Sequence, residues 1–124
     1  MDVPSEGFSK NKYGMYEPIE LRDKELEAYR RLVKNYPKNT HYKYLLASSY
    51  WRSAYFDDAI ATYADVVDMA AEFSNASILM LACIFYEQEN KEKAQAYLDR
   101  HNRIARERGE PPAKDRIEEI YTDQ

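Results

Sequence analysis

The sequence predicts an all-α protein made of antiparallel helix-turn-helix repeats, and three observations lead to this fold class. Small alanines recur one helical turn from aromatic residues, as in Ala47 with Tyr50 and Ala59 with Tyr63. Such spacing is typical of helices that cross so closely that only a methyl group fits at the contact. The same pattern returns 35 residues further along the chain, and prolines or turn residues separate the helical segments.

The repeat is visible when the chain is compared with itself. A shift of 35 residues places Leu46, Ala47, Tyr50, Ala59 and Tyr63 on Leu81, Ala82, Phe85, Ala94 and Leu98, which keeps the size class at all five positions. A shift of 34 residues in the other direction brings Tyr63 onto Tyr29, in a segment that ends at Pro37, where a helix must stop. The repeated unit is therefore a pair of helices.

These residues resemble the tetratricopeptide repeat family, whose 34-residue units follow a degenerate pattern of Trp, Leu, Gly, Tyr, Ala, Phe and Pro. The two full units start at Thr40 and Asn75 and match the pattern at the aligned positions named above. The first unit supplies only its second helix, with Glu25 where a small residue is expected. The Trp and the terminal Pro are missing from both full units. The resemblance covers about 90 residues and implies a TPR-like α-solenoid.

These anchors predict helices near residues 18–36, 40–53, 56–72, 75–88, 91–108 and 113–122. The last helix carries Ile117, Ile120 and Tyr121 at i, i+3, i+4 spacing, so we expect it to cap the stack by covering the helix before it. Residues 18–124 are assigned to one TPR-like repeat domain. Residues 1–17 lack a helical period and are assigned to an extended N-terminal arm, whose aromatic residues we expect to lie in an apolar groove.

The residues offer no support for an enzyme, a cofactor or a metal site. His41 and His101 are far apart in sequence, and neither has a Cys or a carboxylate at a relay or ligand spacing. The three glycines cannot form a phosphate loop. Cys83 is the single cysteine, which excludes an internal disulfide, and it has no basic neighbour that would activate its thiol. We therefore predict a non-enzymatic protein without cofactor, metal or catalytic residues.

Composition places the chain in the cytoplasm, provided that no leader was removed. The longest apolar run, around residues 76–86, is too short to span a bilayer, and the first ten residues lack the basic start and apolar centre of a secretory signal. The net charge of −4 is too weak and too mixed to indicate nucleic acid or a membrane surface. Whether the chain associates with further copies of itself is left open.

The resemblance implies a concave groove that binds a protein or peptide segment, with the protein acting as an adaptor or as a subunit of a larger assembly. The variable groove positions of the family fall here on His41, Tyr44, Ser48, Trp51 and Arg52, and then on Ala76, Leu79, Cys83, Tyr86 and Glu87. Aromatic anchors beside an arginine are typical of binding hot spots. Some relatives grip a chaperone's terminal carboxylate through Lys and Asn, which are replaced here by Tyr44 and Ser48, so that partner is not expected.

Two alternatives remain beside this groove. The face could be filled by the protein's own N-terminal arm, or by tighter packing of the stack, instead of a partner. The protein could also be a structural one that binds nucleic acid or another anionic partner through the helix at 91–108, which holds six bases against three acids. Tyr97 is the one Phe, Tyr or Trp among those bases, whereas a single-strand groove requires a series of interleaved aromatic residues, so nucleic acid is the less favoured partner.

Overall fold

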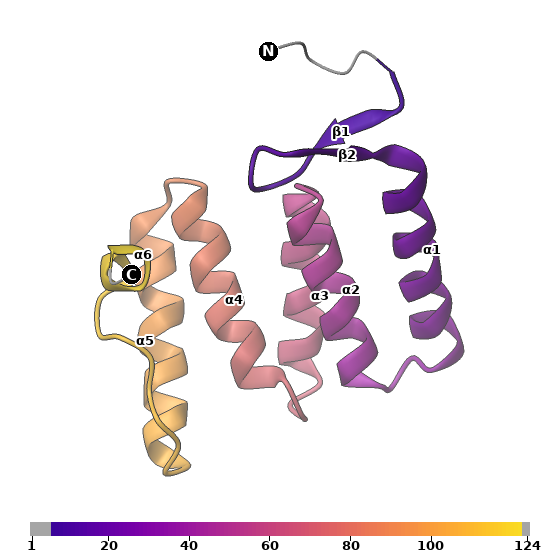
Figure 1. The fold of residues 1–124 in the computed structure, drawn as a ribbon. Helices are drawn as coiled ribbons and strands as arrows, with labels where there is room; N and C mark the ends of the chain where they lie inside the picture. The colour runs from indigo at the N-terminus through magenta and orange to yellow at the C-terminus, as the bar shows by residue number, and fades with distance from the viewer. Residues whose placement is uncertain (1–5, 123–124) are drawn as a thin grey trace. The chain divides into compact units, whose positions relative to one another are not determined.

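The structure is a computed structural model that describes residues 6–122. The described residues form six helices and one two-stranded sheet (Figure 1). Helices account for 68% of these residues, so the all-α prediction is confirmed. The chain divides into two compact units, Met1–Thr62 and Tyr63–Gln124, and the boundary falls inside helix α3 (Phe56–Asp68).

The first unit is organised around the pairing of two helices, α1 (Ile19–Asn35) and α2 (Thr40–Arg52). Leu26 of α1 and Leu46 and Ala47 of α2 are buried in this unit's core. The turn between the helices is built by its own residues, because the Asn39 side chain accepts a hydrogen bond from the backbone N–H of Tyr42 at 3.0 Å and so caps α2.

A β-hairpin precedes α1 in the same unit, where the sequence suggested only an extended arm. Strands β1 (Phe8–Lys10) and β2 (Tyr16–Pro18) pair antiparallel, with Ser9 opposite Glu17. The side-chain oxygen of Asn11 accepts hydrogen bonds from the backbone N–H groups of Tyr13 and Met15, each at 3.0 Å. These bonds fix the tight loop that reverses the chain.

The second unit is organised around α4 (Ser74–Glu87) and α5 (Lys91–Glu107), which lie side by side in Figure 1. The Asn90 side chain caps α5 by accepting from the backbone N–H of Lys93 at 3.3 Å. The rings of Phe85 on α4 and Tyr97 on α5 stack with centroids 5.6 Å apart. The buried apolar residues of this unit include Ile78, Leu81, Ala82, Ile84, Phe85, Ala94, Leu98, Ala105 and Ile117.

The observed bounds of α1, α2, α4 and α5 agree with the predicted ones within one residue, but α3 and α6 are shorter. Helix α3 ends at Asp68 because Ala70 adopts a left-handed φ of 49°, which a continuing helix cannot contain. Helix α6 spans Ile117–Thr122 and starts four residues later than predicted. Its first N–H group, on Ile117, donates to the Gln95 side chain of α5 at 2.9 Å, so α5 determines where this helix begins.

Candidate functional site

The groove residues predicted in the first unit all lie on α2, and the N-terminal hairpin reaches one end of this row. Trp51 is half-buried, and the Nζ atom of Lys12 lies 3.4 Å from the centroid of its ring. The backbone N–H of Lys12 also donates to the carbonyl oxygen of Arg52 at 2.9 Å, one of the carbonyls that a helix end leaves without a helical partner. Tyr44 and Ser48 are half-buried, and His41 is exposed at the other end of the helix.

Arg52, expected to contact a partner, is bound within the unit. Its guanidinium forms an ion pair and hydrogen bond with Glu25 of α1, and this bond raises the pKa of Arg52. The hydroxyl of Ser49 donates to the same Glu25 oxygen at 3.2 Å. Glu25 stands where the tetratricopeptide pattern expects a small residue, and here polar bonds join α1 to α2 at that point.

The groove residues predicted in the second unit all lie on α4, and α6 covers one end of this row. The rings of Tyr86 and Tyr121 stack with centroids 4.7 Å apart and an interplanar angle of 26°. The Tyr121 hydroxyl donates to Oε2 of Glu87 at 2.7 Å and lies 3.1 Å from the carbonyl oxygen of Cys83. Burial, together with the hydrogen bond to the Glu87 carboxylate, raises the pKa of Tyr121 far above its usual range.

The middle of the α4 row, beside α6, opens into a pocket of about 520 Å³. Leu79 and Cys83, two of the predicted residues, contribute to its lining. Apolar groups dominate the lining, and its two charged residues are Lys114 and Glu119. The full lining consists of Leu79, Met80, Cys83, Pro112, Ala113, Lys114, Glu119 and Ile120. A volume of several hundred Å³ with mainly apolar walls is typical of pockets that accept a ligand or a partner's side chains.

Polar side chains of α5 hold the loop that forms one wall of this pocket. Asn102, only 2% exposed, accepts from the N–H of Ala113 at 2.8 Å and donates to the carbonyl oxygen of Lys114 at 2.9 Å. Gln95 donates to the carbonyl oxygen of Asp115 at 2.9 Å. These bonds replace the backbone bonds of the helical turn predicted at residues 113–116, so the segment stays irregular and the wall keeps a defined position.

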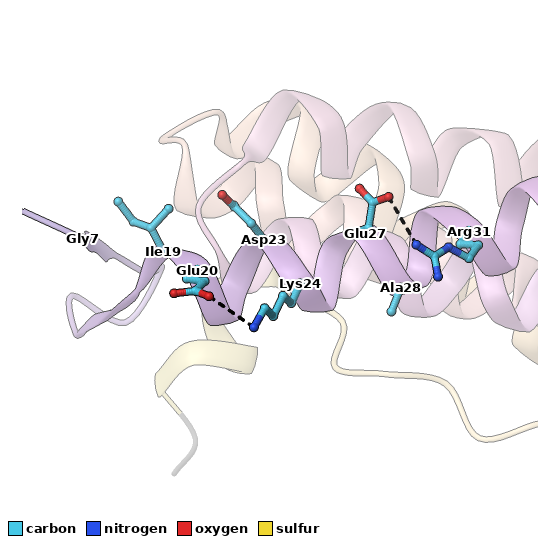
Figure 2. A pocket seen from close by; sticks show the side chains of 8 residues that line it. All are labelled: Gly7, Ile19, Glu20, Asp23, Lys24, Glu27, Ala28 and Arg31. Carbon is cyan, nitrogen blue, oxygen red and sulfur yellow. Dashed lines mark ion pairs between the residues drawn. The ribbon is translucent and has the colours of Figure 1, made fainter.

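A larger hollow, of about 720 Å³, lies on α1 in the first unit (Figure 2). It contains none of the predicted groove residues, and most of its lining is charged. Figure 2 shows two exposed ion pairs along it, Glu20 with Lys24 at 3.2 Å and Glu27 with Arg31 at 3.7 Å. The smaller pocket beside α4 is the better candidate site, because it contains two of the predicted groove residues, Leu79 and Cys83.

Three of the six bases on the predicted basic helix contact the chain's own residues. Lys91 pairs with a carboxylate of α6, and the Nζ atom of Lys93 lies 4.4 Å from the ring centroid of Phe85. Arg106 forms an ion pair with Asp115 at 3.0 Å. The other three bases, Arg100, Arg103 and Arg108, are exposed, and the contacts described for this helix do not include them.

The histidine that lies near polar groups has a structural role. Nδ1 of His101 lies 2.8 Å from the carbonyl oxygen of Asn75, whose side-chain amide donates back to the carbonyl oxygen of His101 at 3.3 Å. This reciprocal pair joins α5 to α4. The described residues contain no group of three or more His, Cys, Asp or Glu side chains suited to hold a metal ion, and no described helix is long and apolar enough to cross a membrane.

Sequence reasoning missed six of the eight pocket residues. Met80 adjoins the predicted Leu79 in an apolar run, and Ile120 lies on the apolar side of the last helix, so both carried a recognisable signal. Residues 112–114 carried none, because their place depends on hydrogen bonds to α5. The last helix was expected to cover α5 alone, whereas α6 contacts both α5 and α4.

Alkaline pH is expected to weaken the docking of α6. The folded-state pKa of Tyr121 is raised, so its stabilising contribution is present below the unfolded-state pKa of about 10 and is lost as the pH rises above it. Tyrosinate absorbance of the wild type and of Tyr121→Phe should coincide near pH 10 and differ only at higher pH. A deficit of about half a tyrosinate in Tyr121→Phe already at pH 10, as a tyrosine of ordinary pKa would give, would contradict the assigned environment.

Comparison with known proteins gave no relative: no protein-family model matches the chain, and no curated protein matches its sequence. The class of protein therefore rests on its own features. The first is an all-α fold. The second is an apolar pocket beside α4 in the second unit, where α6 covers the α4 row at Tyr86.

Proposed function

We propose that the protein is a non-enzymatic protein-protein interaction module of TPR-like helix repeats, which binds a protein segment at the pocket beside α4. The observation that carries this proposal is the 520 Å³ apolar pocket, because it includes Leu79 and Cys83, two positions that the resemblance assigns to partner binding. The module would serve as an adaptor or as a subunit of a larger assembly in the cytoplasm.

The burial of the repeat alanines supports the TPR-like assignment. Ala47, Ala59, Ala82 and Ala94 are each 0% exposed, as small residues at close helix crossings must be. The bounds of α1, α2, α4 and α5 agree with the helices predicted from the repeat, which also supports this assignment. The arrangement of the helix pairs as a continuous solenoid is part of the proposal.

The chemistry of the pocket favours a protein segment with apolar side chains. Its α4 wall presents Leu79, Met80 and Cys83, and Ile120 comes from α6. Burying one aliphatic side chain in such surroundings is worth about 1.5–3 kcal/mol, so a short segment needs several of them to offset the cost of association. The described residues around the pocket offer no basic cluster that would select a polyanion, because Lys114 is accompanied by Glu119.

The second candidate function, binding of an anionic partner through α5, has weaker support. Three of the six bases on which it depends are engaged by α6, by Phe85 and by Asp115. A partner that used these bases would have to compete with contacts that already exist. Arg100, Arg103 and Arg108 would have to supply most of the attraction.

A peptide selection tests the proposed function. Peptides selected from a random display library on the immobilised protein would be labelled and titrated by fluorescence anisotropy against the wild type and Leu79→Ala. We expect Leu79→Ala to weaken binding about tenfold, or about 1.4 kcal/mol, because part of an apolar wall is lost. The matched control is Leu21→Ala, since Leu21 is 64% exposed on α1 and lies outside the pocket.

Salt dependence separates the two functions. Binding at the apolar pocket should change little between about 50 and 200 mM salt, whereas displacement of counterions from a polyanion gives a steep loss of affinity. Equal affinities of Leu79→Ala and the wild type, or peptide binding that collapses with salt, would contradict the proposed function.

A further inference from the structure

Helix α6 packs against α4, where it covers part of the predicted binding face. It is only six residues long, and a helix of that length has no stability of its own in water, so its contacts hold it in place. Ile117 is 0% exposed, and Tyr121, one turn later, stacks on Tyr86. The buried side of α6 therefore carries an aliphatic residue followed four positions later by a tyrosine that contacts α4.

The surface beneath Tyr121 selects for the chemistry of that side chain. The ring of Tyr86 provides the stacking partner. Oε2 of Glu87 accepts a hydrogen bond from the Tyr121 hydroxyl, with the two oxygens 2.7 Å apart. Hydrogen bonds to a charged acceptor are roughly twice as strong as neutral ones, so an aromatic ring with a donor at its tip fits this surface better than phenylalanine. Phenylalanine would leave Glu87 without the Tyr121 hydroxyl.

Helix α6 uses only part of the α4 face. Leu79 lies seven residues before Tyr86 on α4, which corresponds to about 10.5 Å along the helix axis. The pocket at Leu79, Met80 and Cys83 remains an open hollow of about 520 Å³ while α6 is bound. Glu119 and Ile120 of α6 form part of the pocket wall, whereas Leu79, Met80 and Cys83 belong to α4. A segment that takes the place of α6 and also covers these α4 residues would bury apolar surface that α6 leaves exposed, which is what an external partner needs to displace it.

We propose that the α4 face recognises a short amphipathic helical segment of a partner protein with a tyrosine four residues after an aliphatic residue, and that α6 is the built-in competitor for this segment. The inference rests on the proposed function and specifies its partner chemistry. An attached competitor has an effective concentration of the order of millimolar, so a partner must bind appreciably better than α6 does.

The test uses the full chain and a synthetic peptide that copies residues 113–124, AKDRIEEIYTDQ, labelled with fluorescein. In Tyr121→Ala the chain loses the stacking and the hydrogen bond of its own α6. We expect the peptide to bind this variant at least about tenfold more tightly than the wild type, whose site is occupied. The matched control is Tyr16→Ala, which removes a tyrosine that is 41% exposed on the hairpin and should leave the peptide affinity unchanged.

Two further variants keep the test independent of folding. Tyr121→Phe in the chain retains the stacked ring and loses only the hydroxyl, so it should raise peptide affinity by a smaller factor than Tyr121→Ala. A peptide with phenylalanine in place of its tyrosine should bind Tyr121→Ala several-fold more weakly than the original peptide. Circular dichroism confirms that each variant retains its helices.

Equal peptide affinities for the wild type and Tyr121→Ala, or no binding to either folded variant at about 1 mM peptide, would overturn the inference. This failure is distinguishable from failure of the proposed function. If library-selected peptides depend on Leu79 but do not respond to Tyr121→Ala, the pocket binds partners and α6 is only a structural cap.

Discussion

Replacing Leu98 with alanine is expected to lower the free energy of unfolding by about 2–5 kcal/mol. Leu98 is 0% exposed on α5, within the core that α5 shares with α4. The substitution removes apolar contacts and leaves a cavity that the surrounding helices can fill only in part. Urea unfolding followed by circular dichroism measures the change.

The matched control for this substitution is Leu21→Ala. Leu21 is also a helical leucine but is 64% exposed on α1, so its truncation should change the free energy of unfolding by no more than about 0.5 kcal/mol. A similar small loss for Leu98→Ala would contradict the packing described for the second unit.

Replacing Ala82 with leucine is expected to cost about 1–3 kcal/mol through overpacking. Ala82 is 0% exposed and lies between Leu81 and Cys83 in the most buried part of α4. The additional carbons must push neighbouring side chains out of their preferred rotamers or move the helix. Ala47→Leu, at the equivalent position of the preceding unit in the proposed repeat, should behave in the same way in α2.

The matched control is Ala96→Leu, because Ala96 is exposed on α5. Alanine and leucine have similar helix propensities, so this variant should melt within a few degrees of the wild type. Unchanged melting of both Ala47→Leu and Ala82→Leu would mean that these alanines do not mark close helix crossings. The register of the proposed repeats would then be wrong.

Both predicted groove rows are partly covered by other segments of the chain. In each unit the chain's own terminal segment covers one end of the row: Lys12 of the hairpin at Trp51, and Tyr121 of α6 at Tyr86. One alternative is that the N-terminal arm fills the predicted face. In the first unit the hairpin contacts this face at one residue of the row, Trp51. In the second unit the open pocket at Leu79 leaves room for a partner.

The sequence by itself determined the bounds of α1, α2, α4 and α5, because the signals that define these helices are local. Asn39 and Asn90 cap α2 and α5 through side-chain bonds to N–H groups three residues away, and Pro37 follows the end of α1. The spacing of Ala82 and Phe85 placed both on the buried side of α4. Caps and periodicity depend on neighbours within one or two turns, so they can be recognised without knowledge of the fold.

Only the tertiary structure decided the start of α6 and the pocket. Asn102 and Gln95 bond the backbone of residues 113–117 from α5, and this overrides the helical tendency of that segment. Tyr121 reaches Glu87 across 34 positions of sequence, and no periodic pattern encodes such a contact. Side chains that bond or stack between distant segments take their partners from the packing of the helices, which is why the sequence located the α4 row but not the pocket wall or the helix that covers it.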